Sequence, residues 1–310
     1  MLNVRAHGIL GVFIQLFFSN PNVAEKELFK NMGAGGVHGF LFRPPNPCTY
    51  THETLEPTLV FKRTSRGSNI PIAVHMPPGY RNRRYITIDE DYWILFSHGN
   101  AEDLGNVGIW GGILSEVLDM VVVTYDYTGY GMSNSLDGNI HIYPSEENVY
   151  SDVEAVLEFA EALLGYSRKQ AILWGRSLGS SPTAYIASKC KKEGQPVAGV
   201  VLQSPFTSVL GVAFNSHVQK LSENDVFRNY DRIRESEGFD APCFVIHGEN
   251  DWIVNCWHGK EIARIIPERF RWPPLFNDCG HNDLESKDPD EFIREISGFI
   301  DFCKLVGEET

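Results

Sequence analysis

An apolar run that ends in Gly-x-Ser-x-Gly constrains the fold of this chain more than any other stretch. Residues 172–181 are Ile-Leu-Trp-Gly-Arg-Ser-Leu-Gly-Ser-Ser. This pattern is typical of a strand that turns sharply into a helix, because glycines on both sides leave room for a strained turn that lifts the serine above the sheet. The serine is Ser177. With 28 glycines in the chain, an ordinary glycine-flanked turn also fits, so the surrounding sequence must decide.

Segments with the length and apolarity of strands alternate with helix-like segments through most of the chain. Strands are expected at residues 58–64, 70–76, 92–97, 120–125, 171–174, 197–203, 243–247 and 270–277. Helices are expected at residues 104–118, 145–164, 177–189, 255–265 and 289–303. Turn residues at 65–69 predict an N-terminal antiparallel hairpin, whereas the later alternation predicts parallel neighbours. We therefore expect the α/β class: a mostly parallel eight-stranded sheet with helices on both faces.

The alternating region contains no repeat and no linker that would divide it. Residues 58–305 are therefore expected to form one domain. Residues 1–57 precede it as an apolar segment and an irregular lead-in rich in Gly, Pro and Asn. Residues 205–241, where a fold of this class would carry a cap, are too few for a large one. We expect a small cap or none, and a site that opens directly to solvent or to a membrane surface.

Charge and cysteine content exclude several classes of function. A net charge of -13 argues against a nucleic-acid partner, because phosphate backbones are bound by clustered Lys and Arg. The six cysteines have no C-x-x-C spacing, which argues against a zinc site and a disulfide framework. We therefore expect no metal, no cofactor and a reducing compartment.

An apolar run at residues 9–18 is the one segment that suggests a membrane. It is too short to span a bilayer, and it lacks the small-residue cleavage site of a signal peptide. Binding flat in a membrane interface and packing on the domain explain it equally well. We expect a cytoplasmic protein; if residues 9–18 bind a membrane interface, it would be peripheral on the cytoplasmic face of membranes.

A serine hydroxyl needs a base and an acid before it can attack a carbonyl. In an open parallel sheet such groups stand on loops after the carboxyl ends of strands. Asp251 follows the strand expected at 243–247, and His281 follows the last strand. We call the sharp strand-to-helix turn that carries Ser177 the nucleophile elbow, or elbow. In folds with such an elbow, the serine, the acid and the base follow one another along the chain in the order seen here for Ser177, Asp251 and His281. We therefore assign these three residues as nucleophile, acid and base.

Other residues compete for the two partner roles. His247 is the main alternative base, but its place at a strand end within the acid's own loop favours bracing that loop. The competing carboxylates are Glu249, Asp278, Asp283 and Asp126. Asp283 follows the base too closely to reach its other nitrogen. Asp126 belongs to a loop rich in glycine and aromatic residues, which is expected to shape the pocket instead.

The tetrahedral intermediate needs hydrogen-bond donors at its oxyanion. The backbone N–H of Leu178 supplies one, and the backbone N–H of Asn100 or Ala101, in the loop after the strand at 92–97, supplies the second. Candidates for lining an acyl groove are Trp110, Phe206, Trp252 and Ile253. Ordinary core packing explains each of these four residues equally well.

Several motifs together resemble the α/β-hydrolase domain-containing protein 17 family. They are LFSHGNAEDLG (95–105), YDYTGYG (125–131), GRSLG (175–179), IHGEND (246–251) and GHND (280–283), with FRPP (42–45) and TSRG (64–67). The resemblance extends from about residue 40 to the C-terminus. It implies the α/β-hydrolase fold, a serine hydrolase without a metal, and the same roles for Ser177, Asp251 and His281.

The resemblance also implies a substrate class, because members of the family remove palmitoyl groups from protein cysteines at membranes. Some members have a cysteine-rich, palmitoylated N-terminus, whereas the first cysteine here is Cys48; residues 9–18 are the expected substitute. The predicted function is hydrolysis of an acyl thioester or ester, on an acylated protein or a lipid-like ester. Alternatives are an esterase or peptidase of the same fold and a non-catalytic binding scaffold.

Overall fold

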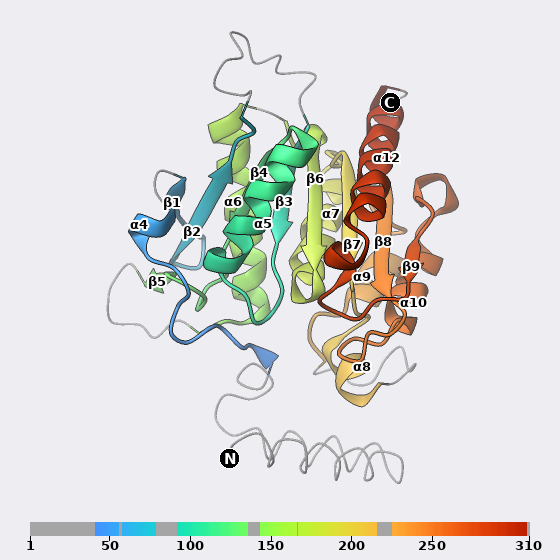
Figure 1. The fold of residues 1–310 in the computed structure, drawn as a ribbon, viewed down its shortest axis with the longest axis horizontal. Coiled ribbons are helices and arrows are strands. Elements are labelled where there is room, and N and C mark those ends of the chain that lie inside the picture. Colours follow the sequence, from blue (N-terminus) through green and yellow to red (C-terminus); the bar gives the residue numbers. More distant parts are fainter. Residues whose placement is uncertain are drawn as a thin grey trace.

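A mostly parallel sheet with helices packed on both faces forms the body of the molecule (Figure 1). The structure, a computed structural model, describes residues 41–55, 58–78, 92–135, 143–165, 167–215 and 225–308. The expectations for residues 9–18 and for most of the lead-in lie outside these residues. Within the described residues, no helix has the length and apolar character needed to cross a membrane.

The main sheet runs in the order β1-β2-β4-β3-β6-β7-β8-β9. These strands are β1 (Leu59–Arg63), β2 (Ser68–His75), β4 (Val121–Tyr125), β3 (Trp93–Ser97), β6 (Ala171–Arg176), β7 (Gly199–Gln203), β8 (Cys243–Gly248) and β9 (Leu275–Asn277). β2 pairs antiparallel with both β1 and β4, and from β4 to β9 all neighbours are parallel. The two-residue β5 (Asn134–Ser135) adds to β2. The expected α/β class, eight strands and N-terminal antiparallel hairpin are confirmed.

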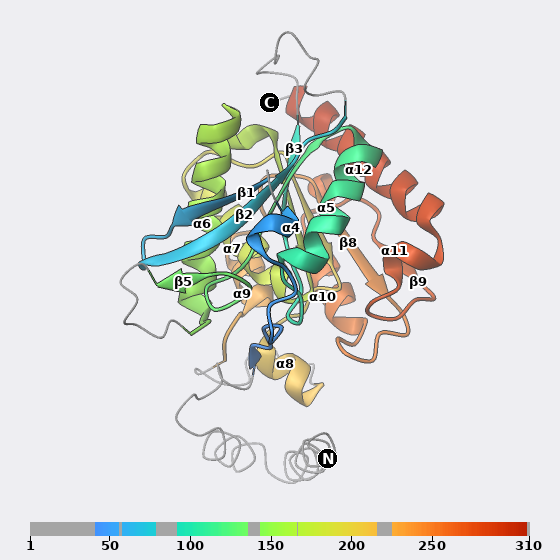
Figure 2. The ribbon, with the colours of Figure 1, turned by 60° about the vertical axis from the view of Figure 1, so that its left-hand side comes forward.

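Two hydrophobic layers cover the sheet, one on each face. Alternate side chains along each strand belong to opposite layers, because successive side chains point to opposite faces. Ile94 and Phe96 pack with α5 (Leu104–Leu118) and α12 (Pro289–Glu308). Trp93 and Leu95 pack with α6 (Glu146–Leu164), α7 (Ser180–Lys192) and α10 (Trp257–Ile265). Figure 2 shows α6 and α5 on opposite sides of the strands. Both faces of the central strands are therefore buried, as their continuous apolar runs predict.

The last strand is shorter than expected. The prediction of a strand over 270–277 is wrong for its first half, because β9 covers Leu275–Asn277 only. Phe270 ends a short 3-10 turn, η5 (Glu268–Phe270), and Arg271 makes one isolated bridge to Cys243. Pro273 and Pro274 follow after Trp272, and neither can donate a backbone hydrogen bond to a neighbouring strand.

Short helices and 3-10 turns lie in the connections between the strands and the longer helices. They are α4 (His52–Leu55), α8 (Val209–Phe214), α9 (Asn229–Glu235) and α11 (Leu284–Lys287), with the 3-10 turns η3 (Arg168–Gln170) and η4 (Ser177–Gly179). The segment between β7 and α9 contributes α8, whose first turn is capped by the Ser208 side chain accepting from the Gly211 N–H. The described residues of this connection form no large cap.

Candidate active site

The turn from β6 into α7 holds Ser177 in a strained backbone conformation. Its φ is +51°, a left-handed value that a non-glycine residue adopts only when the surrounding structure enforces it. A Cβ on Gly175 would lie 2.3 Å from the Gly179 carbonyl oxygen, and a Cβ on Gly179 would lie 2.0 Å from the Ser97 carbonyl oxygen. Gly175 is therefore needed for the turn to close on itself, and Gly179 for the turn to pack against β3.

Three side chains from three loops form one hydrogen-bonded chain. The Ser177 Oγ lies 3.0 Å from His281 Nε2, and His281 Nδ1 lies 2.6 Å from Asp251 Oδ2. A carboxylate can only accept, so Nδ1 carries the hydrogen and Nε2 is left to accept from the serine. Ser177 follows β6, Asp251 follows β8 and His281 follows β9. The structure thus brings together the three residues expected from the sequence, in the geometry of a Ser-His-Asp triad.

Asp251 is held as a carboxylate by its surroundings. Burial opposes its ionisation, but hydrogen bonds from His247 and His281 outweigh burial and hold the pKa of Asp251 well below its usual range. The backbone N–H groups of Ile253 and Val254 also donate to it, at 2.9 Å and 2.8 Å. This carboxylate can therefore both orient the imidazole and stabilise a positive charge on it.

The competing residues have other roles. His247 is fully buried, and its Nε2 donates to the Val254 carbonyl at 2.8 Å and lies 3.2 Å from Asp251 Oδ2, so it braces the acid and its loop. Asp126 accepts from the Tyr50 hydroxyl at 2.5 Å and from the Leu104 N–H at 2.8 Å, and burial raises its pKa to about 8. The remaining carboxylates bind elsewhere: Glu249 to Lys260, Asp278 to Lys287, and Asp283 to the Gly280 N–H.

The loop after β3 lies beside the serine. We define residues 98–101 as the oxyanion loop; Gly99, Asn100 and Ala101 line the same cavity as Ser177 and Leu178. Leu178 is the second residue of η4, where a helix leaves its N–H without an internal acceptor. The Asn100 side chain is occupied, because its Oδ1 accepts from the Tyr130 hydroxyl at 2.6 Å and its Nδ2 donates to the Leu41 carbonyl at 2.7 Å. Only the backbone N–H of Asn100 is therefore a candidate donor, along with that of Ala101.

A mainly apolar cavity of about 400 Å³ adjoins Ser177. Of the four expected lining residues, Phe206 and Ile253 are there. Trp110 is not, because it packs against Phe292 of α12 in the layer on one face of the sheet. Trp252 is not either: its side chain is 85% exposed. The expected roles of Trp110 and Trp252 in an acyl groove therefore lack support from the structure.

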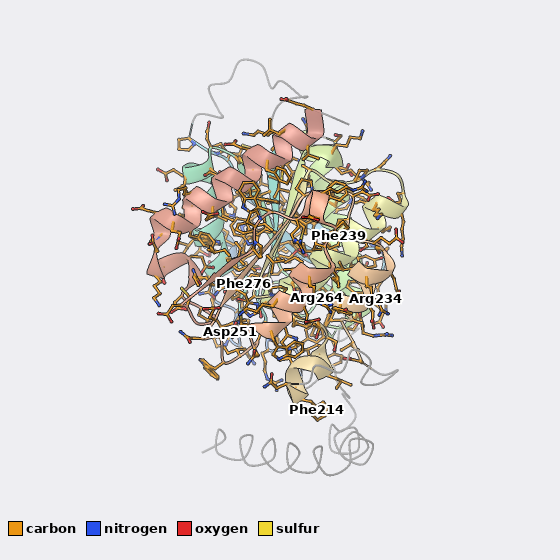
Figure 3. All side chains as sticks on the ribbon, turned by 90° about the vertical axis from the view of Figure 1, so that its right-hand side faces the viewer. Phe214, Arg234, Phe239, Asp251, Arg264 and Phe276 are labelled. Atoms are coloured by element: carbon orange, nitrogen blue, oxygen red, sulfur yellow. The ribbon has the colours of Figure 1, made fainter. Side chains whose placement is uncertain are left out.

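Several lining residues were missed by the sequence reasoning. They are the apolar residues Leu41, Val209, Val212, Ala213 and Val254 and the polar or charged residues Arg43, Glu102, Arg176 and Asn282. Three of them belong to α8, whose apolar spacing was visible but could equally have served core packing. Leu41 lies 59 residues before Asn100, and no local pattern links such distant positions. Phe214 of α8 and Asp251 lie toward the same end of the molecule (Figure 3).

Known proteins resemble this chain in sequence and in fold. A family model described as "Serine aminopeptidase, S33" matches residues 89–224. Alpha/beta hydrolase domain-containing protein 17C of Xenopus tropicalis is 33% identical over 238 residues, which cover 76% of this chain and 68% of that protein. The chain belongs to the α/β-hydrolase domain-containing protein 17 family. It is thus an enzyme, a serine hydrolase.

Two further proteins resemble this chain, one in sequence and one in fold. An alpha/beta hydrolase of Acanthamoeba polyphaga mimivirus is 31% identical over 264 residues, covering 84% of this chain and 92% of that protein. The esterase Pf2001 of Pyrococcus furiosus superposes with a TM-score of 0.60 at 16% identity, covering 84% of this chain and 97% of that one. The last likeness shows the fold alone. In the described part of the chain, no cluster of three His, Cys, Asp or Glu side chains could hold a metal ion.

Proposed function

We propose that the protein hydrolyses long-chain acyl thioesters or esters, and that its substrates are palmitoylated proteins. The apolar cavity next to Ser177 carries this proposal, since it offers a hydrophobic site continuous with a serine that is hydrogen-bonded to a histidine. Membership of a hydrolase family supports the reaction class. The choice of palmitoyl groups comes from the resemblance to that family and from the apolar character of the cavity.

In this proposal the reaction proceeds through an acyl-enzyme. His281 Nε2 takes the proton of Ser177 as Oγ attacks the thioester carbonyl, and Asp251 stabilises the imidazolium. Backbone N–H groups of Leu178 and of Asn100 or Ala101 donate to the oxyanion. The C–S bond then breaks, and His281 gives its proton to the leaving thiolate. Water, deprotonated by His281, attacks the acyl-serine; the bond to Ser177 Oγ breaks, His281 returns the proton to Oγ, and the fatty acid is released.

The length of the acyl chain decides between this proposal and its nearest alternative. Each methylene buried in the cavity contributes about 0.8 kcal/mol, so kcat/KM should rise about fourfold per methylene until the cavity is filled. The name of the matching family model favours a second candidate, a peptidase. Such an enzyme would cleave aminoacyl amides and gain little from a longer acyl chain.

The test measures kcat/KM on acyl thioesters of four to sixteen carbons, on matched esters and on an aminoacyl anilide. The proposal expects a steep rise with chain length and weak activity on the anilide. It also expects that Ser177→Ala abolishes both turnover and labelling by a fluorophosphonate. A flat chain-length profile would contradict the long-chain assignment, and a variant still labelled at the same site would contradict Ser177 as nucleophile.

A further inference from the structure

Arg176 lies between the elbow glycine Gly175 and the serine, and its guanidinium points away from the sheet core toward two neighbouring loops. Its side chain is 17% exposed. The Nη1 atom donates to Glu102 Oε1 at 2.6 Å, and the Nη2 atom donates to Asn282 Oδ1 at 3.2 Å. One side chain therefore connects the elbow to the segment after the oxyanion loop and to the residue that follows His281.

The contact to Glu102 reaches the oxyanion loop itself. The other carboxylate oxygen of Glu102 accepts from the Gly99 N–H at 2.7 Å. A Cβ on Gly99 would lie 2.9 Å from that same oxygen, so glycine is what allows the carboxylate to come this close. Arg176 and the Gly99 backbone are thus joined through one rigid carboxylate, and the turn that carries Asn100 and Ala101 is tied to the residue before Ser177.

The contact to Asn282 reaches the loop of the proposed base. We define residues 278–283 as the histidine loop. Behind it, Glu285 of α11 lies 3.8 Å from Arg176 Nε and accepts from the Gln203 side chain at 2.6 Å. Gln203, at the end of β7, accepts in turn from the Trp174 indole N–H at 3.0 Å. The network therefore spans the ends of β3, β6 and β7 and the connection after β9.

We propose that Arg176 is a positioning residue, which holds the oxyanion loop and the histidine loop at fixed distances from Ser177. The inference rests on the proposed function, since it assigns these two loops their roles in acyl transfer. A planar guanidinium suits this task because its donors are fixed relative to each other and can bind two acceptors at once. Its charge also offsets the carboxylates of Glu102 and Glu285, which would otherwise oppose negative charge on a nearby oxyanion.

The experiment compares kcat and KM of four proteins: wild type, Arg176→Met, Arg176→Lys and Glu102→Gln. Arg176→Met is expected to lower kcat about 10- to 100-fold, because small displacements of catalytic groups have effects of this size. KM should stay within about threefold, since in the proposed function the acyl chain binds the apolar residues that line the cavity rather than Arg176, which lines it beside Ser177. Lysine should recover part of kcat, because an ammonium can bind Glu102 or Asn282 but lacks the fork that binds both.

The double variant of Arg176→Met with Glu102→Gln separates one network from two independent effects. If the two residues act together, the double variant should lose no more kcat than Arg176→Met alone. If the fold-loss of kcat in the double variant equals the product of the losses in the two single variants, the residues act independently and the inference is overturned. If Arg176→Met does not fold, Arg176→Lys and Glu102→Gln carry the same test, because each keeps most of the contacts.

The chain offers a matched control at the other end of the same strand. Arg168, which precedes β6, has a 19% exposed side chain and binds Glu161 and Glu193. Arg168→Met should lower the thermal midpoint about as much as Arg176→Met while leaving kcat unchanged. Wild-type kcat in Arg176→Met, or a raised KM at unchanged kcat, would overturn the inference. Full activity in Ser177→Ala would instead overturn the proposed function.

Discussion

Backbone sterics at single residues determine how the elbow forms. Ser177 has a positive φ, and Gly179 sits so close to β3 that any side chain would overlap the Ser97 carbonyl. Strain of this kind typically amounts to roughly 1–3 kcal/mol and persists only where neighbouring contacts enforce it. The pattern Gly-x-Ser-x-Gly is therefore a packing requirement as well as a chemical one.

Replacing Gly179 by alanine should destabilise the protein and lower kcat, because the new methyl group must displace β3 or the elbow. Overpacking at a tight contact costs about 1–3 kcal/mol. Gly112, inside α5, is the matched control, since nothing lies within 4 Å of a Cβ built there; Gly112→Ala should stabilise by about 0.5–1 kcal/mol. Urea unfolding gives the free energy of unfolding of each variant, and kcat is measured alongside. If Gly179→Ala were as stable and as active as Gly112→Ala, the close contact of Gly179 with β3 would be refuted.

At the scale of elements, α8 and the loops after β3, β6 and β8 form the cavity that adjoins Ser177. Val209, Val212 and Ala213 all belong to α8 and all line it. The helix is only six residues long, so its position depends on its Ser208 cap and on packing beneath it more than on helix propensity. Because α8 supplies so much of the apolar wall, it is the element expected to set the preferred acyl chain length.

Ala213→Trp should fill part of the cavity and shift the chain-length preference downward. We expect kcat/KM for a sixteen-carbon thioester to fall at least tenfold, with a four-carbon substrate affected by less than threefold, since about two lost methylene contacts already account for a factor of ten. Val117→Trp, at a half-exposed position on α5, controls for an added indole. If both substrates lose activity equally, α8 does not limit chain length.

Another element, α6, anchors the loop after β4 through a buried carboxyl group. Asp152 accepts from the Thr128 N–H and faces the Thr128 hydroxyl, both at 2.7 Å, and that hydroxyl also lies 2.8 Å from Ser68 Oγ. Burial raises the pKa of Asp152 to about 7, although the bonds from Thr128 lower it. A protonated carboxyl can donate to the Thr128 hydroxyl, which then donates to Ser68.

This raised pKa predicts a pH-dependent stability. Between about pH 4 and pH 7 the folded state keeps the proton of Asp152 and the unfolded chain loses it. The contribution of Asp152 to the free energy of unfolding is therefore fully present below the ordinary pKa of an aspartate. It falls by about 1 kcal/mol per pH unit as the pH rises to 7. The side chain in Asp152→Asn cannot titrate. Its free energy of unfolding in urea should therefore rise relative to that of the wild type by about 1 kcal/mol per pH unit between pH 5 and pH 7. Parallel pH profiles would contradict a buried, protonated Asp152.

For the molecule as a whole, local sequence rules predicted the sheet and the residues that stand directly after its strands. The sheet, its hairpin and its parallel half followed from apolar runs, and the rule that polar groups stand after strands led to Ser177, Asp251 and His281. The cavity wall did not follow, because long-range packing decides it. Trp252 is adjacent to Asp251 in sequence yet points into solvent, whereas Leu41 reaches the cavity from far along the chain.

The role of residues 9–18 can be tested directly. We propose that residues 9–18 bind a membrane interface and that the enzyme works on the cytoplasmic face. Deleting residues 1–20 should reduce co-sedimentation with liposomes at least several-fold, because an apolar run contributes interfacial affinity. Activity on a soluble short-chain ester should stay at the wild-type level, since the described wall of the cavity begins at Leu41. Unchanged liposome binding would disprove the anchor.

The hydrogen bond from Asn100 to the Leu41 carbonyl ties the first described residue of the lead-in to the cavity wall. Residues 19–40, 22 in number, separate it from the proposed anchor and can span no more than roughly 75 Å when fully extended. If the anchor is in the membrane, the cavity therefore samples only a small volume above the bilayer. Each acyl chain in that volume is present at an effective concentration on the order of millimolar, so even a modest KM for the free substrate would suffice for rapid turnover at the surface.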